Sequence, residues 1–326
     1  MDKERTRVGT RKHIPIAVGA RAFWQSYKCR NIRKHKMLYV FLLPAVVLTV
    51  IFSYAPLFGL IIAFQDYTIA DGVSKSEFIG FRMFYKILFS YNSNYQAFRN
   101  TVYIALIRIV TNFPLILVFT LLVNEVKSKK WNRFILTVSY MPYFISWVAV
   151  SEMTFSLFDT NGIFNTVLVK LGREPINWYA DPDVWWPILT ISSLWKSMGF
   201  STLIYMSSLG MIDDELYDAC KIDGGGRFRQ ALTVTLPGLM NVMVMQLILD
   251  VGSLMSDNYD QIRALTMGSE AVDERVFVIG AVEFNDTLSG TFTKGTTYGL
   301  IRGVIGICLV TLSNRLAKSA DCEGIL

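Results

Sequence analysis

The chain has 326 residues, of which 52% are hydrophobic and 18% are charged, and its mean hydropathy is +0.37. Soluble domains carry about 25% charged residues, so this chain lacks the polar surface that a soluble two-domain enzyme requires. The net charge is +6, and 11 of the 32 Lys and Arg residues fall within the first 36 positions. The composition therefore predicts a membrane protein with a basic N-terminal segment.

The basic segment, residues 1–36, is followed at once by an apolar run, which favours the cytoplasmic flank of a membrane span over an arm that binds nucleic acid. Residues 14–36 form either a basic amphipathic helix on the inner leaflet or a disordered tail. Both histidines lie in this segment, and the four cysteines form no close pairs, so the pattern indicates neither a zinc site nor a disulfide framework. The sequence also contains no GxxxxGK[ST] motif for ATP.

Six apolar segments follow the basic segment, and each has at least the ~20 residues that cross a bilayer. We predict membrane spans at residues 37–64, 98–124, 134–158, 184–209, 237–256 and 295–314. The first span lacks charges throughout, is too long for a signal peptide, and is expected to kink at Pro44 or Pro56. Because lipid offers the backbone no hydrogen-bond partners, the predicted fold class is an all-α helical membrane bundle.

The distribution of Lys and Arg predicts the orientation of this bundle. With the N-terminus inside the cell, the internal segments hold 20 basic residues and the external segments hold 8. The positive-inside rule then places both termini in the cytoplasm, including the short tail at 319–326.

The internal loop between the fourth and fifth spans, residues 210–237, is the most informative segment. Asp213 or Asp214 is placed to accept hydrogen bonds from the free N–H groups that open a helix. The helix is expected to end at Asp223-Gly224, where glycine can adopt a positive φ. A second short helix then starts near Arg227 and leads to the fifth span.

Within this loop the chain reads Asp218-Ala219-Cys220, then Asp223-Gly224-Gly225, then Val234, Leu236 and Pro237. In order and spacing these residues resemble the EAA loop, E-A-A-x-x-D-G-(A)-x(8)-I-x-L-P, of the permease subunits of ATP-binding-cassette (ABC) importers. The replacements keep charge or small size. From residue 37 to 318 the chain resembles maltose-type carbohydrate permeases, and it is most similar to permease subunits that import complex oligosaccharides or polysaccharides, including the alginate type.

The resemblance implies a six-helix permease of a type I ABC importer with a cytoplasmic coupling helix, in a bacterial inner membrane. Small side chains in the loop would let this helix sit deep in a groove of the ATPase; an ordinary loop helix with a glycine cap is the alternative. The residues implied to couple to the ATPase are Asp213, Asp214, Glu215, Asp218, Ala219, Cys220, Asp223, Gly224, Gly225, Leu236 and Pro237.

The resemblance also implies the partners. The chain is expected to be a noncatalytic transport subunit with no cofactor of its own, because separate ATPase subunits hold ATP and Mg²⁺. An ATPase dimer, a second permease of similar but distinct sequence, an extracytoplasmic solute-binding protein, a saccharide and membrane lipid are the expected partners. Nucleic acid is not among them.

Charged residues inside the predicted spans leave two interpretations open, because each must face protein or water rather than lipid. The first interpretation pairs Asp250 with Arg302 and Glu152 with Arg108, which would hold helices together. The second places them along a path for a saccharide of acidic type, with Lys196 as the leading candidate because it has no obvious partner and lies beside an aromatic side chain. The candidate pathway residues are Lys196, Trp195, Arg108, Glu152, Asp250 and Arg302.

An ion-coupled secondary transporter of a small polar solute is the main alternative function, with Asp250 or Glu152 as a proton or sodium relay. Such carriers usually show two related halves, and the sequence has no comparable repeat. A membrane-anchored scaffold would not explain charges in every predicted span except the first.

Overall fold

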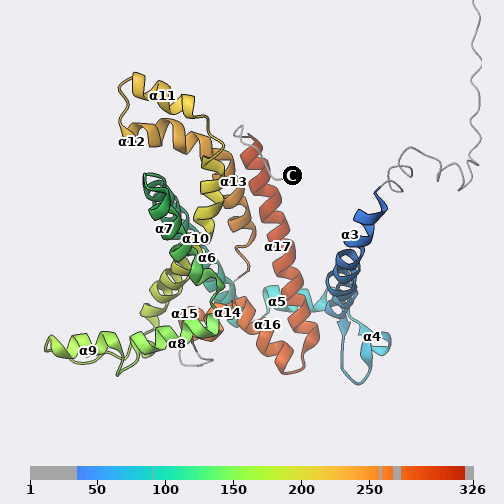
Figure 1. Cartoon of the computed structure of the whole chain (residues 1–326). Helices are drawn as coiled ribbons and strands as arrows, with labels where there is room; N and C mark the ends of the chain where they lie inside the picture. Colours follow the sequence, from blue (N-terminus) through green and yellow to red (C-terminus); the bar gives the residue numbers. More distant parts are fainter. Residues whose placement is uncertain (1–34, 91, 257–258, 267–272, 320–326) are drawn as a thin grey trace, which may run out of the picture. The chain divides into compact units, whose positions relative to one another are not determined.

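The computed structural model describes residues 35–90, 92–256, 259–266 and 273–319, and it divides into two compact units, Met1–Leu60 and Ile61–Leu326. Most of the described chain is helical (Figure 1). The expected amphipathic helix at 14–36 lies outside the described residues except for its end, and so does the C-terminal tail beyond residue 319.

The first predicted span is a helical stretch of 29 residues, Lys36–Phe64. It consists of α3 (Lys36–Thr49), the π-helical turn η1 (Val50–Tyr54) and the 3₁₀ helix η2 (Ala55–Phe64). Pro44 lies inside α3 without interrupting it, whereas the winding changes just before Pro56. The ring of Pro56 would clash with the carbonyl four residues earlier, and the wider π turn relieves that crowding.

Four long helices form the bundle of the second unit: α6 (Asn92–Asn124), α10 (Trp185–Leu209), α13 (Leu236–Gly252) and α17 (Phe292–Ser319). Helix α10 packs along α6 and against α13, and α13 packs in turn against α17. A buried cluster of Ile116, Tyr205, Leu209 and Leu239 joins α6, α10 and α13.

The third predicted span is broken. Helix α7 (Lys129–Tyr140) continues as the 3₁₀ helix η3 (Met141–Phe144), and α8 (Trp147–Phe158) then leaves at an angle of 101°. The span predicted at 134–158 therefore corresponds to a bent pair of helices and not to one straight helix. Ile145 and Ser146 adopt extended backbone, and the Ser146 hydroxyl accepts a hydrogen bond from the N–H of Ala149, which starts a new helix.

The fifth span begins ten residues earlier than predicted. Helix α12 (Arg227–Gln230), the π turn η6 (Ala231–Thr235) and α13 form one helix of 26 residues, Arg227–Gly252. The expected separate short helix is thus the first part of the span, and Pro237 lies inside the helix directly after a π turn, as Pro56 does in the first span. The span also ends at Gly252 rather than at 256.

Length and composition alone identify four described helices that can cross a membrane, or five if the bent pair from α7 to α9 (Ile163–Lys170) counts as one span. Helix α10 has 25 residues, which is long enough, but its serines make it less apolar. Every predicted span thus corresponds to a helix or a broken helix. The sixth is longer than expected, Phe292–Ser319 instead of 295–314.

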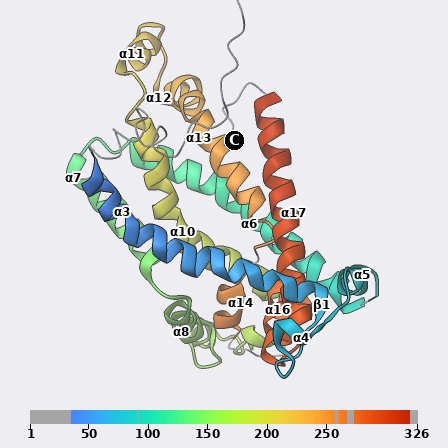
Figure 2. The same cartoon turned by 90° about the vertical axis from the view of Figure 1, so that its right-hand side faces the viewer.

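Short elements gather at one end of the second unit, away from the loop that joins α10 to α12, as Figures 1 and 2 both show. The strands β1 (Gln65–Asp66) and β2 (Glu77–Phe78) pair antiparallel, with Gln65 opposite Phe78. The helical elements are α4 (Gly72–Lys75), α5 (Arg82–Phe89), η4 (Trp178–Ala180), η5 (Pro182–Val184), α14 (Tyr259–Leu265), α15 (Asp273–Val276) and α16 (Ile279–Leu288).

Candidate functional site

The loop between α10 and α12 contains the predicted helix, α11 (Asp214–Ile222). The Asp213 side chain caps it by accepting a hydrogen bond of 3.0 Å from the N–H of Glu215. Acidic residues fill the first turn and Lys221 lies in the last, which suits the helix dipole at both ends. A hydrogen bond of 2.7 Å to Asp218 raises the pKa of Lys221. The predicted cap is confirmed, with Asp213 in that role.

The helix ends at the predicted glycine. Gly224 has φ of +76°, and its N–H donates to the carbonyl of Lys221 at 3.0 Å. The N–H of Gly225 donates to the carbonyl of Cys220 at 2.8 Å, so the turn closes back on the helix. A Cβ on Gly225 would lie 2.5 Å from the Cys220 Sγ, which explains why only glycine fits there.

Three contacts connect α11 and the turn that closes it to the helix that follows. The Tyr217 hydroxyl lies 3.2 Å from the Thr235 Oγ1, and the Cys220 Sγ lies 3.6 Å from the Thr233 Oγ1. The Gln230 amide donates to the carbonyl of Gly225 at 3.0 Å. Because α12, η6 and α13 are continuous, α11 and the fifth span form one connected element.

A salt bridge ties the same region to the second span. The Arg227 guanidinium at the start of α12 lies 3.2 Å from the carboxylate of Glu125, just after the end of α6.

The outer surface of α11 combines carboxylates with large exposed apolar side chains: Leu216 is 55% exposed and Ile222 is 87% exposed. Such a mixed surface is typical of a docking site rather than of a free loop.

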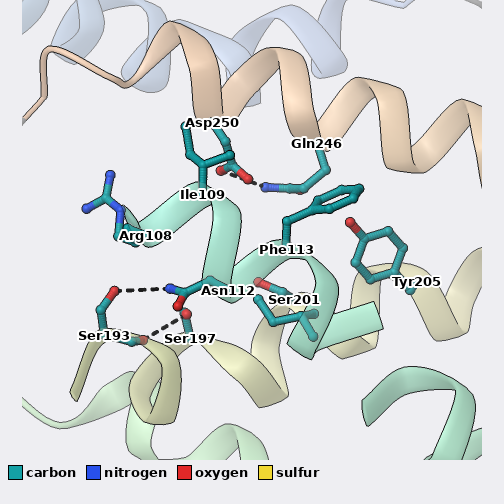
Figure 3. A pocket seen from close by; sticks show the side chains of 11 residues that line it. Arg108, Ile109, Asn112, Phe113, Ser193, Ser197, Ser201, Tyr205, Gln246 and Asp250 are labelled. Atoms are coloured by element: carbon teal, nitrogen blue, oxygen red, sulfur yellow. Dashed lines mark hydrogen bonds between the residues drawn. The ribbon is translucent and has the colours of Figure 1, made fainter. Parts of the chain in front are cut away.

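A polar pocket of about 180 Å³ lies between α6, α10 and α13 (Figure 3). Its polar lining comes from Arg108, Asn112, Ser193, Ser197, Ser201, Tyr205, Gln246 and Asp250, with Ile109, Phe113 and Ile116 as the apolar part. The Asn112 amide reaches the Ser193 hydroxyl at 3.5 Å, and the Gln246 amide reaches the Asp250 carboxylate at 3.4 Å. These helices thus present hydrogen-bonding groups and charges inside the bundle, which is unusual in a membrane protein and points to a path for a polar solute.

Sequence reasoning found two residues of this pocket, Arg108 and Asp250, and missed the uncharged ones. A signal was present, because the polar residues recur at intervals of four, which places them on one face of a helix. On α10 the series is 193, 197, 201 and 205; on α6 it is 108 and 112; on α13 it is 246 and 250. The prediction from the sequence rested on charged residues and one tryptophan, so it did not include these serine, asparagine, glutamine and tyrosine side chains.

The expected charge pairs are not the observed ones. Arg302 forms a salt bridge of 2.6 Å with Glu283 of α16, and its Nε donates to the carbonyl of Met255 at 3.0 Å. The expected pairing of Arg302 with Asp250 is therefore wrong. Arg108 lines the pocket of Asp250, whereas Glu152 lines a different pocket beside α14, so the pairing of these two is also not what the structure shows.

The structure gives Lys196 partners that the sequence did not reveal. Its ammonium donates to the carbonyls of Pro142 and Tyr143, at 3.3 and 3.0 Å, and to the carbonyl of Ile145. It also lies 5.2 Å from the ring centre of Trp147. These carbonyls lie at the C-terminal end of η3, where the third span breaks. The Lys196 ammonium therefore caps this helix end.

The predicted pathway residues therefore fall in several places. Trp195 lines an apolar pocket between α8 and α10, and Arg302 lines a glycine-rich groove beside α13 and α17. Arg108 and Asp250 line the same pocket, between α6, α10 and α13. In the loop at 210–237, by contrast, the predicted residues from Asp213 to Gly225 lie on α11, its cap and the turn that closes it, and Leu236 and Pro237 open α13.

Comparisons with known proteins agree with this architecture. Residues 116–259 match the family model described as binding-protein-dependent transport system inner membrane component. Protein LplB of Bacillus subtilis (strain 168) is 33% identical over 300 residues, which cover 90% of this chain and 92% of LplB. The polygalacturonan/rhamnogalacturonan transport system permease protein YteP of the same organism is 33% identical over 298 residues, covering 90% of this chain and 91% of YteP.

The solved structures include a bacterial alginate ABC transporter in complex with an alginate pentasaccharide-bound periplasmic protein. One of its chains matches with a TM-score of 0.80 and 26% sequence identity, covering 91% of this chain and 99% of that chain. The residues matched by the family model include α10, α11 and α13, and hence the loop and most of the polar pocket.

Proposed function

Because this chain belongs to the family of binding-protein-dependent transport system inner membrane components, we propose that it couples ATP hydrolysis in separate subunits to import of acidic oligosaccharides. The chain is a permease subunit of a carbohydrate importer and not an enzyme. Family membership decides against the ion-coupled secondary transporter. The observation that carries the coupling proposal is the hydrogen-bonded connection of α11 to the continuous helix that lines the polar pocket.

The coupling surface is proposed to be the exposed side of α11. Its carboxylates, which include Asp214, Glu215 and Asp218, would face a basic rim on the ATPase, and Leu216 and Ile222 would enter an apolar groove. ATP and Mg²⁺ would then bind to the ATPase dimer. The proposal includes a cytoplasmic location for α11 and both termini, which the excess of Lys and Arg in those segments supports.

The path of the movement follows from the contacts. A push on α11 reaches α13 through the Tyr217–Thr235 contact and the continuous helix, and it reaches α6 through the Arg227–Glu125 salt bridge. Both helices line the pocket, with Gln246 and Asp250 on α13 and Arg108 on α6. Closure of the ATPase pair would therefore shift two walls of the pocket relative to α10, which is how alternating access is proposed to arise.

The substrate class is proposed from the pocket and from the relatives. YteP is named for polygalacturonan and rhamnogalacturonan, and the matching structures are of an importer of the acidic polysaccharide alginate. A guanidinium such as that of Arg108 suits the carboxylate of a uronate, and the serines and amides suit its hydroxyls. A second, similar permease chain would complete the path, because one chain offers one coupling loop and two ATPase subunits need two.

Uptake into proteoliposomes tests the proposal. The complex of this chain with its second permease, its ATPase and its binding protein is reconstituted, and labelled tetragalacturonate is supplied outside with ATP inside. Uptake that requires hydrolysable ATP and persists with an ionophore supports the proposal. Uptake that follows the ion gradient and ignores ATP would contradict it.

A further inference from the structure

A second polar pocket, of about 580 Å³, lies between α8 and α14. Figure 1 places these helices at the end of the second unit opposite α11. The pocket falls within the roughly 300–1,000 Å³ that is usual for small-molecule sites. Its lining residues are Trp147, Val148, Ser151, Glu152, Asp260, Arg263 and Ala264. None of these residues belongs to the pocket between α6, α10 and α13.

The charged groups of this pocket are available to a ligand. Glu152 and Asp260 are exposed, and neither carboxylate has an ion-pair partner among the described residues. The Arg263 guanidinium lies 4.0 Å from the ring centre of Phe284, and this ring holds it in place without taking up its N–H donors. Two acceptors and one donor group therefore converge on the same space from α8 and α14.

The aromatic wall of the pocket is fixed in position. Trp147 is the first residue of α8, directly after the break in the third span, and the Lys196 ammonium lies 5.2 Å from its ring centre. Because the same ammonium holds the carbonyls of Pro142 and Tyr143, it connects the indole to the end of η3. The ring is thus held before any ligand arrives, which lowers the entropy that binding costs.

We propose that this pocket binds one pyranose ring of the incoming oligosaccharide, as a site separate from the pocket inside the bundle. The weakly positive C–H bonds on one face of a pyranose match the negative face of the Trp147 indole. The Glu152 and Asp260 carboxylates accept hydrogen bonds from the sugar hydroxyls, and Arg263 donates to a further oxygen. With two carboxylates against one guanidinium, the pocket prefers a ring that presents hydroxyls over one that presents its own carboxylate. This inference rests on the proposed function, which places the pocket on the external side.

Equilibrium binding tests the proposal with the assembled importer in lipid nanodiscs, without binding protein. The probes are fluorescently labelled tetragalacturonate and its carboxyl-reduced form, galactotetraose. We expect variants of this pocket to lose more affinity for galactotetraose than for tetragalacturonate. Trp147→Ala, and separately the double variant Glu152→Gln with Asp260→Asn, should weaken binding of galactotetraose at least tenfold. The amide variants keep the shape of the side chains, so they report on charge even if loss of the indole disturbs α8.

The matched controls are Trp131→Ala, an exposed tryptophan on α7, and Glu174→Gln, an exposed carboxylate outside the pocket. Both should bind the probes within twofold of the wild type. Pocket variants that bind as tightly as these controls, or a wild type that binds neither probe, would overturn the inference. Stimulation of ATPase activity by loaded binding protein, measured on the same samples, shows whether only this site or the proposed function has failed.

Discussion

Lys196 illustrates how a charge inside a membrane protein is stabilised by backbone. The third span breaks after η3, so no following turn supplies N–H groups to the carbonyls at the break, and among the described residues only that of Pro142 accepts a backbone N–H, from Ile145. In lipid such carbonyls are costly, and the Lys196 ammonium satisfies three of them, those of Pro142, Tyr143 and Ile145. The break thus supplies carbonyl partners for the Lys196 ammonium, and the ammonium stabilises the carbonyls that the break exposes.

Replacing Lys196 by Met should destabilise the complex by about 1–2 kcal/mol, because the carbonyls lose their donor while the aliphatic stem is kept. The melting temperature of the solubilised complex should fall by a few degrees. Lys196→Arg, which restores a cation and its donors, should recover most of the loss. A Met variant that melts together with the wild type would show that the carbonyls find other partners.

At this scale the sequence predicted the local chemistry of the coupling loop but not the partners of buried charges. Asp213 and Gly224 act on groups within a few residues, so their roles follow from helix geometry alone. Lys196 and Arg302 have partners about 50 and 19 residues away along the chain, respectively. A single sequence does not contain that information.

The break in the third span is held by close packing between α7 and α10. A Cβ on Gly199 would lie 2.1 Å from the backbone of Ser139, so the two helices touch at their main chains. One turn away, the rings of Tyr143 and Phe200 stack with centres 4.1 Å apart. Three residues within about one turn of α10, Lys196, Gly199 and Phe200, thus hold the bend between α7 and α8 in place.

Gly199→Ala should therefore be strongly destabilising, because the clash is with backbone and α10 cannot move aside without leaving α6. We expect a large loss of assembled complex in size-exclusion chromatography. Gly303→Ala in α17 is the matched control, since its Cβ would meet open space and alanine favours a helix by up to about 1 kcal/mol. Equal yields of the two variants would be inconsistent with the tight contact.

Helix positions were predicted well and helix ends less well. The apolar runs located every span, because length and hydropathy are properties of the segment itself. The break at Ile145 and the early start of the fifth span at Arg227 were missed. In both spans one and five, a π turn precedes a proline, at Pro56 and Pro237, so these prolines lie inside helices that they were expected to kink or to open.

For the whole molecule, the orientation in the membrane is the first quantity to test. In a variant whose native cysteines are replaced, Thr160→Cys between α8 and α9 should react with a membrane-impermeant maleimide in intact spheroplasts. Asp214→Cys in α11 should react only after permeabilisation, because the excess of Lys and Arg predicts that this loop lies inside the cell. Labelling of both cysteines from the same side would refute the proposed topology.

The central claim is that α11 transmits the state of the ATPase to the pocket, and Gly224→Pro tests it most directly. Proline cannot adopt φ of +76° and removes the N–H that donates to Lys221, so the end of α11 must open. Gly172→Pro is the matched control: Gly172 has φ of +74° and donates to Val169 at the end of α9, far from the loop in Figure 1.

The measurement is ATPase activity of the reconstituted complex, with and without binding protein loaded with tetragalacturonate. We predict that loaded binding protein stimulates the wild type and Gly172→Pro, whereas Gly224→Pro assembles with its partners but loses the stimulation. An assembled Gly224→Pro complex that is stimulated as strongly as the wild type would contradict the account.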